Sequence, residues 1–220
     1  DGMPVVREER YEHKDVGSVY PPLNLLQIAT MLRETKTEVS LVDANGFDLN
    51  HEQAMKEIEE KGRPDVIVSR IAFDAQEADL AELRRVKERT GAKLIIRNKI
   101  ISDAHWVRDD LMKKHPWVDM FVNEEFEVGL PDILAGIDSK KPLAEIPGIT
   151  YSNGGVHATA PSTRIHDRVY KPAFDMIPTL QPYHSGVIDG PFTLLTTSQG
   201  CPFGCDFCAY ARTKFIVRKP

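Results

Sequence analysis

Residues 64–71 have the sequence PDVIVSRI, a β-branched apolar run that is typical of a strand buried on both faces of a parallel sheet. Three further stretches predict shorter strands: 38–43 (EVSLVD), 93–96 (KLII) and 118–122 (VDMFV). Stretches with helical character lie between or beside them: 22–34, 51–61, 75–89, 104–114 and 125–135. Strands that alternate with helices of this length predict an α/β fold with a doubly wound, Rossmann-like parallel sheet.

The chain changes character between residues 136 and 190, where Pro, Gly, Ser and Asn accumulate. Residues 149–152 and 156–159 flank Asn153-Gly154, which predicts a β-hairpin. The prolines that follow predict an extended crossover, and residues 193–197 (TLLTT) predict one more strand. We therefore expect three parts: an α/β domain over 1–140, a hairpin and linker over 141–190, and the start of a second domain over 191–220.

The composition narrows the class of protein. The chain has 220 residues, 41% of them hydrophobic, and a net charge of −5, which disfavours a nucleic-acid partner. No stretch approaches the roughly 20 apolar residues of a transmembrane helix, and the first residues lack the apolar core of a secretory signal. We expect a cytoplasmic protein with no nucleic-acid partner and no transmembrane segment.

All three cysteines lie within eight residues, in the sequence Cys201-Pro-Phe-Gly-Cys205-Asp-Phe-Cys208. An odd, tightly clustered set is a poor disulfide framework, and such clusters more often bind metal. Iron–sulfur clusters are held by thiolates, and a cubane cluster usually takes four. Three close thiolates would therefore leave one iron open to a small chelating molecule.

Two other readings of the cysteines stay open. Zinc could bind the three thiolates with a fourth His or Asp ligand, although structural zinc sites usually pair two knuckles and this chain has no second one. A redox pair of Cys205 and Cys208 is the other alternative, but it would leave Cys201 unexplained. We favour the iron–sulfur cluster.

The motif and its surroundings resemble a known family. Three cysteines with this spacing, and an aromatic residue before the last one, resemble the first βα loop of the radical S-adenosylmethionine (SAM) barrel. Four other segments resemble the subfamily that carries a cobalamin-binding (B12-binding) domain: 20–32 (YPPLNLLQIATML), 42–45 (VDAN), 146–149 (IPGI) and 197–202 (TSQGCP). The resemblance covers most of residues 17–220. It implies that 1–140 is a cobalamin-binding-like domain and that 191–220 begins a radical SAM barrel with its first strand and cluster loop.

The resemblance also implies a chemistry. Cys201, Cys205 and Cys208 would hold a [4Fe–4S] cluster, and the enzyme would cleave SAM reductively to start methylation, C–C coupling or ring formation. Phe207 would lie near the SAM adenine. The substrate would be a small-molecule or lipid-like compound, and the electron donor a protein such as flavodoxin or ferredoxin. No residue is assigned as catalytic.

Both ends of the chain look unfinished, so we expect a fragment that is inactive alone, in which residues 2–6 at most partly replace a missing first strand. The alternative function is a non-catalytic α/β binding or docking module with a structural metal site. Formation of 5′-deoxyadenosine from SAM by the reconstituted protein would separate the two.

Two segments depart from the subfamily pattern. A Gly-Gly-Pro-His stretch near the corrin is replaced by residues 96–101 (IRNKII), and a Gly-Glu-Gly-Glu stretch by residues 124–127 (EEFE). Glycine permits close backbone approach to a ligand, so these changes predict that cobalamin binds weakly or not at all. Asp103-Ala104-His105 matches the beginning of a cobalamin-ligand motif, but Arg108 stands where that motif needs glycine, and we interpret the match as accidental.

Overall fold

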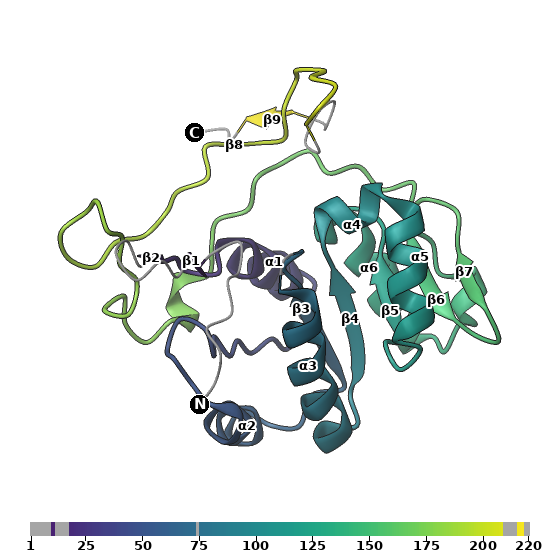
Figure 1. Cartoon of the computed structure of the whole chain (residues 1–220), viewed down its shortest axis with the longest axis horizontal. Coiled ribbons are helices and arrows are strands. Elements are labelled where there is room, and N and C mark those ends of the chain that lie inside the picture. Colours follow the sequence, from purple (N-terminus) through teal and green to yellow (C-terminus); the bar gives the residue numbers. More distant parts are fainter. Residues whose placement is uncertain (1–9, 12–17, 74, 209–214, 218–220) are drawn as a thin grey trace. The chain divides into compact units, whose positions relative to one another are not determined.

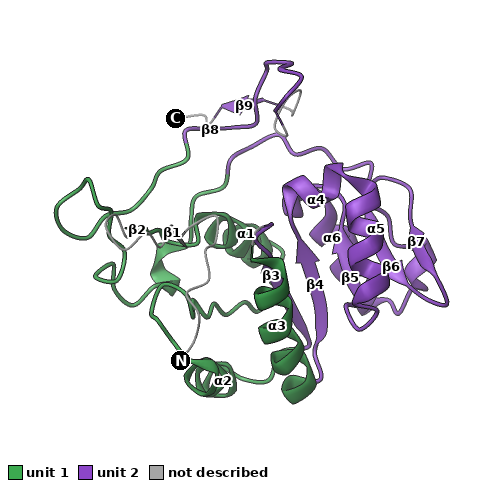
Figure 2. Ribbon diagram, in the orientation of Figure 1, with its two compact units in different colours: residues 1–64, 74–90, 170–196 green, residues 65–73, 91–169, 197–220 purple. Residues whose placement is uncertain are grey.

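The computed structural model describes residues 10–11, 18–73, 75–208 and 215–217. The chain divides into two compact units, drawn in different colours in Figure 2. Unit 1 comprises residues 1–64, 74–90 and 170–196, and unit 2 comprises residues 65–73, 91–169 and 197–220. Both units are therefore assembled from segments that lie far apart in the sequence.

Unit 2 is built on a five-stranded sheet with the order β3-β4-β5-β6-β7 (Figure 1). Strands β3 (Val66–Arg70), β4 (Lys93–Arg97) and β5 (Met120–Val122) are parallel. Strands β6 (Ile149–Ser152) and β7 (Val156–Ala158) continue the sheet as an antiparallel hairpin. The apolar runs at 64–71, 93–96 and 118–122 thus form the parallel strands, and the α/β fold class predicted from them is confirmed.

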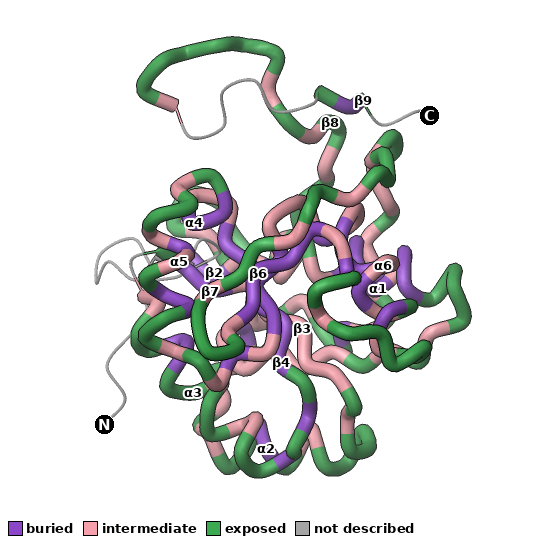
Figure 3. The backbone as a smooth tube through the Cα atoms, turned by 90° about the vertical axis from the view of Figure 1, so that its right-hand side faces the viewer, coloured by how far each residue is buried: buried purple, intermediate pink, exposed green. Residues whose placement is uncertain are grey.

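The core of unit 2 lies along its central strands, and Figure 3 shows that much of β4 is buried. Its helices are α4 (Lys99–Asp103), α5 (His105–Lys114) and α6 (Phe126–Asp138). The Ser152 hydroxyl on β6 donates to the Met112 carbonyl oxygen on α5 at 2.7 Å. A Cβ atom added to Gly129 of α6 would lie 2.7 Å from Val122 Cγ1 of β5, so this helix needs glycine to approach the sheet closely.

Unit 1 contains the helices α1 (Leu23–Glu34), α2 (His51–Glu60) and α3 (Gln76–Thr90) and the short pair β1 (Arg10–Tyr11) and β2 (Ser18–Val19). Each helix was predicted from the sequence to within a few residues. Helix α2 begins at a capping box, because Asn50 accepts from the Gln53 backbone N–H and the Gln53 side chain accepts from the Asn50 N–H. Gly62 and Gly91, which follow α2 and α3, have φ angles of 99° and 72°.

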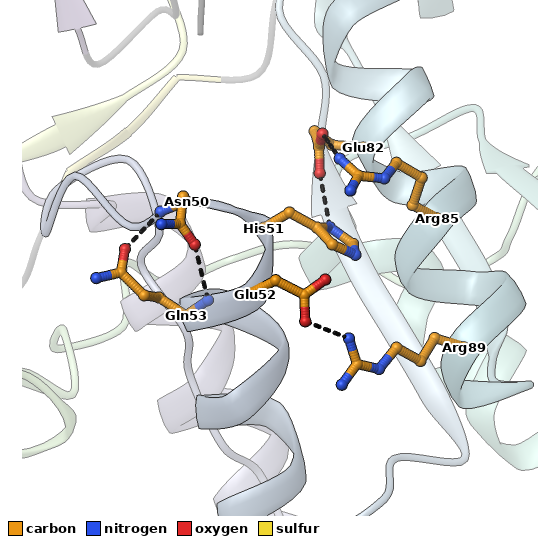
Figure 4. A network of polar contacts seen from close by, with 7 residues as sticks. All are labelled: Asn50, His51, Glu52, Gln53, Glu82, Arg85 and Arg89. Atoms are coloured by element: carbon orange, nitrogen blue, oxygen red, sulfur yellow. Dashed lines mark hydrogen bonds and ion pairs between the residues drawn. The ribbon is translucent and has the colours of Figure 1, made fainter. Parts of the chain in front are cut away.

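Charged side chains join α2 to α3 (Figure 4). Arg89 on α3 lies 2.9 Å from a carboxylate oxygen of Glu52 and 3.0 Å from one of Glu59. His51 lies 2.9 Å from Glu82, which also pairs with Arg85. These pairs are largely exposed, so they align the two helices more than they stabilise them.

Residues 170–196 of the crossover belong to unit 1 and contact its β2 and α1. Backbone hydrogen bonds join Val19 of β2 to His184 in both directions, and the Gln27 side chain of α1 donates to the Tyr170 carbonyl oxygen at 3.0 Å. Tyr183 is fully buried in a cluster with Val19 and Leu26. Its hydroxyl donates to Asp43 Oδ2 at 2.8 Å, and burial raises the pKa of Tyr183 well above its ordinary value of 10.0.

Two strand predictions are wrong. Residues 38–43 form no strand; Leu41 packs instead against the cluster around Tyr183, and Asp43 begins a turn in which its carboxylate accepts from the Gly46 N–H at 2.8 Å. Residues 193–197 are not a strand either. The strand that precedes the cysteine loop is β8 (Ser198–Gln199), which pairs with β9 (Ile216–Val217). Residues 2–6, predicted to replace a first strand in part, lie outside the described residues.

Within the described part of the chain, no helix combines the length and the apolarity that crossing a membrane requires.

Candidate functional site

The three cysteines lie on one loop that directly follows β8. Cys201 and Cys208 are half-buried and Cys205 is exposed. The Cys208 backbone N–H donates to the Cys205 carbonyl oxygen at 3.1 Å, so a tight turn carries the last two cysteines. Gly200 has a φ angle of 83°, a left-handed conformation that favours glycine at the start of the loop.

The structure does not gather the three sulfurs into one ligand set. Among the residues described, no group of three or more His, Cys, Asp or Glu side chains is arranged to hold a metal ion. The donors nevertheless suit iron, because three thiolates within eight residues on an accessible loop can close around a cluster as it binds. Ligation by Cys201, Cys205 and Cys208 therefore stays a prediction.

Phe207 is 94% exposed on the same loop, so nothing in the described chain covers its ring. Its predicted contact with the SAM adenine stays a prediction as well. The loop is held at its base by a side-chain contact that the sequence does not suggest. His166 Nε2 lies 3.0 Å from Gln199 Oε1, which ties β8 to the segment that follows the hairpin.

The second candidate region is the carboxyl edge of the parallel strands, where open α/β sheets bind their ligands. Arg97 ends β4 and is 3% exposed. Its Nε donates to the carbonyl oxygen of Glu124, and its Nη2 lies 2.9 Å from Glu125 Oε1. Burial lowers the pKa of Arg97, an effect that Glu125 opposes and the neighbouring Arg70 reinforces. We call Arg97, Glu124 and Glu125 the carboxyl-edge clasp.

Asn98 lies behind the clasp and is fully buried. Its Oδ1 accepts from the Ile101 N–H at 3.0 Å, which caps α4, and its Nδ2 donates to the Ile71 carbonyl oxygen at 2.7 Å. Ser102 donates to the Asn98 carbonyl oxygen at 2.8 Å. The polar side chain of Asn98 therefore links the end of β3 to the helix that follows β4.

The carbonyl oxygen of Glu124 contacts Arg97, whereas its side-chain carboxylate binds a different segment of the chain. Its Oε2 accepts from the Ser162 N–H at 3.1 Å, and burial raises the pKa of Glu124. Gly148, in the segment 146–149, has a φ angle of 73°, and a Cβ atom added there would lie 2.5 Å from Glu124 Oε2. The glycine of this segment is thus required by backbone conformation and by the adjacent carboxylate together.

The motif that starts at Asp103 has a structural explanation. Asp103 pairs with Lys99 one turn earlier in α4, and the His105 ring packs edge-on against Trp106. Arg108, which stands in place of the expected glycine, is buried and donates to Asn123 Oδ1 at 3.2 Å. These contacts are structural, and the interpretation of the match as accidental stays an interpretation.

Comparison with known proteins gives this geometry a context. No protein-family model matches the chain. The uncharacterized methyltransferase PH0819 of Pyrococcus horikoshii is 28% identical over 199 residues, which are 88% of this chain and 41% of that protein. TokK of Streptomyces tokunonensis, a cobalamin-dependent radical SAM methyltransferase, is 30% identical over 123 residues, which are 50% of this chain and 17% of TokK.

Solved structures agree with these relatives. OxsB, a cobalamin-dependent SAM radical enzyme with aqua-cobalamin and SAM bound, superposes with a TM-score of 0.71 at 20% identity, over 90% of this chain and 27% of OxsB. The chain is related to the cobalamin-dependent radical SAM enzymes. The methyltransferase TsrM of Kitasatospora setae, with cobalamin and a [4Fe–4S] cluster bound, gives a TM-score of 0.63 at 17% identity, over 91% of this chain and 41% of TsrM.

The resemblance predicted from the sequence motifs is therefore confirmed, and so is the Rossmann-like fold class. The chain spans 41% of PH0819 and 17% of TokK, so the activities named for these relatives are those of longer proteins. The predicted domain boundaries at 140 and 190 stay predictions.

The names of the relatives imply that cobalamin is a cofactor of this group of proteins. The residues at the carboxyl edge of the sheet show whether this chain could hold a corrin ring there. A flat ligand needs a concave surface that the backbone can approach, which glycine provides. The segments that follow the three parallel strands (71–75, 98–104 and 123–126) contain no glycine, and Arg97 and Asn98 fill the edge between them. The residues present do not fit a corrin at this edge.

Proposed function

We propose that the protein is a radical SAM enzyme in which Cys201, Cys205 and Cys208 hold a [4Fe–4S] cluster. The observation that carries the proposal is the spacing of these cysteines, in a chain of which 91% superposes on TsrM with its cluster bound. The absence of cysteine from the first 200 residues leaves this loop as the one source of thiolates in the chain.

The cluster, when bound, supplies the electron that cleaves SAM to methionine and a 5′-deoxyadenosyl radical. The role of this chain is to hold and orient. Gly200 lets the backbone turn sharply into the loop. The three thiolates would hold a cluster that can bind the amino and carboxylate groups of SAM. The exposed ring of Phe207 is available to cover the adenine once SAM is in place.

The substrate is proposed as a small-molecule or lipid-like compound. One TsrM structure contains tryptophan as substrate, and another relative is the hopanoid C-3 methylase of Methylococcus capsulatus, so related proteins act on compounds of both kinds. A flavodoxin- or ferredoxin-type protein would deliver the electron.

The test is anaerobic reconstitution of the full-length protein with iron and sulfide. We expect a stoichiometric [4Fe–4S] cluster by iron and sulfide analysis, an EPR signal after reduction, and 5′-deoxyadenosine when SAM is added. Cys201→Ala, Cys205→Ala and Cys208→Ala should each lose the cluster, whereas Asp206→Asn in the same loop is the matched control and should retain it. Cluster retention in all three cysteine variants would refute the proposal, and stoichiometric zinc without 5′-deoxyadenosine would favour a non-catalytic docking module.

A further inference from the structure

The carboxyl edge of β3, β4 and β5 is the place where a sheet of this kind binds a ligand, and OxsB and TsrM carry cobalamin. We propose that in this protein the carboxyl-edge clasp closes that edge permanently and that the enzyme works without a bound corrin. This deepens the proposed function, because it concerns which cofactors the enzyme uses.

The clasp is a closed set of contacts. Arg97 is held from two directions, by the Glu124 carbonyl oxygen at Nε and by the Glu125 carboxylate at Nη2. Its burial makes both contacts necessary, because a buried guanidinium without partners is strongly unfavourable. A corrin that displaced Glu125 would uncover this charge without offering a carboxylate in return.

The register of β3 and β4 also disfavours the loss of the Glu125 carboxylate. Arg70 and Arg97 are register neighbours on β3 and β4, so two cations lie side by side at the end of the sheet. Removing the Glu125 carboxylate from Arg97 would leave the repulsion between Arg97 and Arg70 without this opposing charge. The clasp therefore resists opening on the side of β3 as well as on the side of β5.

Asn98 closes the edge below the clasp. Its side chain makes both a capping bond to Ile101 and a bond to the Ile71 carbonyl oxygen across the strand ends. Moving Asn98 aside would leave a buried donor and a buried acceptor unsatisfied in addition to its own amide. The side chain of Asn98 thus ties the first turn of α4 to the end of β3 at this edge.

The two segments that lack glycine are partners of one another. Arg97 belongs to the segment 96–101, and Glu124 and Glu125 belong to the segment 124–127. The two departures from the subfamily pattern, joined by the contact between Arg97 and Glu124 across 27 residues of chain, form a single structural feature. This pairing distinguishes a built closure from two unrelated surface changes.

The test incubates the full-length, cluster-reconstituted protein with excess hydroxocobalamin, removes unbound corrin by desalting, and records the visible spectrum. TokK, treated identically, is the positive control. We expect the corrin to be absent from this protein after desalting, and hydrogen exchange over residues 97–125 to be unchanged by hydroxocobalamin. A stoichiometric corrin spectrum, or slowed exchange over 97–125, would overturn the inference.

A double variant tests the cause. Arg97→Gly with Glu125→Gly removes both side chains of the ion pair and restores glycine to both segments, and we expect hydroxocobalamin to bind at least about tenfold more tightly than to the wild type. If the variant folds, as judged by its circular dichroism, and gains no affinity, the clasp is not the cause and the inference fails. If the variant does not fold, the corrin spectrum and the hydrogen exchange of the wild type decide whether the inference holds. Failure of the proposed function appears separately, as an absence of 5′-deoxyadenosine whatever the corrin content.

Discussion

Gly148→Ala should destabilise unit 2 more than a change of one methyl group suggests. Gly148 lies one residue before β6, and its backbone is bonded on both sides: its N–H donates to the Ala160 carbonyl oxygen at 2.8 Å and its carbonyl oxygen accepts from the Asn123 N–H at 2.9 Å. The φ angle of 73° is therefore fixed by the surrounding structure. An alanine Cβ atom would lie 2.5 Å from Glu124 Oε2, closer than van der Waals contact allows.

Two costs add in this variant. A left-handed backbone conformation destabilises a residue that has a Cβ atom by roughly 1–2 kcal/mol. Alanine also makes the unfolded chain less flexible than glycine does, which stabilises the folded state by about 0.4–1 kcal/mol. Glu124 must also move, and its Oε2 then loses the bond from the Ser162 N–H, which is worth about 1.5–3 kcal/mol for a charged acceptor. The free energy of unfolding should therefore fall by about 2–4 kcal/mol.

The assay is urea denaturation followed by tryptophan fluorescence. Trp106 and Trp117, the two tryptophans of the chain, belong to the same unit as Gly148, so the signal reports the unit that is perturbed. Gly154→Ala is the matched control, because Gly154 has a φ angle of 65° but no atom within 4 Å of an added Cβ atom. In Gly154→Ala the free energy of unfolding should fall only by the net cost of the left-handed backbone, about 0.5–1 kcal/mol.

The clash can be isolated with a second substitution. In a Glu124→Ala background the obstructing carboxylate is absent, so the additional cost of Gly148→Ala should fall to that of Gly154→Ala. Equal losses for Gly148→Ala and Gly154→Ala in the wild-type background, or additive losses in the double variant, would refute the reasoning.

Three further predictions follow from the described contacts. Tyr183→Phe removes the donor to Asp43 and should cost about 1–2 kcal/mol in urea denaturation; in the wild type, the raised pKa of Tyr183 should keep one tyrosine neutral through a spectrophotometric titration above pH 10.0. Burial raises the pKa of Glu124 above 4.5, so the folded state binds more protons just above that pH, and the wild type should lose stability relative to Glu124→Gln as the pH rises from about 4 to 7; a constant difference would contradict this. Arg89→Met breaks exposed pairs to two glutamates of α2, so the free energy of unfolding should fall only slightly at low salt, and 1 M salt should abolish the loss.

The elements that the sequence predicts correctly are those whose cause is local. Residues 66–70 form a strand because β-branched side chains favour extended backbone, although β3 ends the described sheet and is half-buried rather than buried on both faces as its apolar run predicts. Helix α2 begins at Asn50 because its side chain caps the helix. The hairpin over 149–158 follows from Asn153-Gly154 in the same way. Each of these signals is complete within a dozen residues of chain.

The incorrect predictions concern segments whose structure depends on a distant partner. Residues 38–43 have the composition of a strand, but Leu41 packs against a cluster that includes Tyr183, about 140 residues later in the chain. A strand also needs a neighbour with open hydrogen-bonding groups, and no composition shows whether one is present. The site shows the same division: the cysteine spacing is visible in the sequence, whereas the contact of His166 with Gln199 at the base of the loop is not.

The carboxyl-edge clasp shows how two departures from a sequence pattern become informative once they are seen together. Arg97 without Glu125 would be a buried, unpaired cation at the end of a strand, a defect that costs about 3–5 kcal/mol when one partner of such a pair is removed. Glycine in place of Glu125 would therefore leave the buried guanidinium of Arg97 without its carboxylate partner. This dependence of Arg97 on Glu125 makes the clasp one structural feature of the sheet rather than two separate changes.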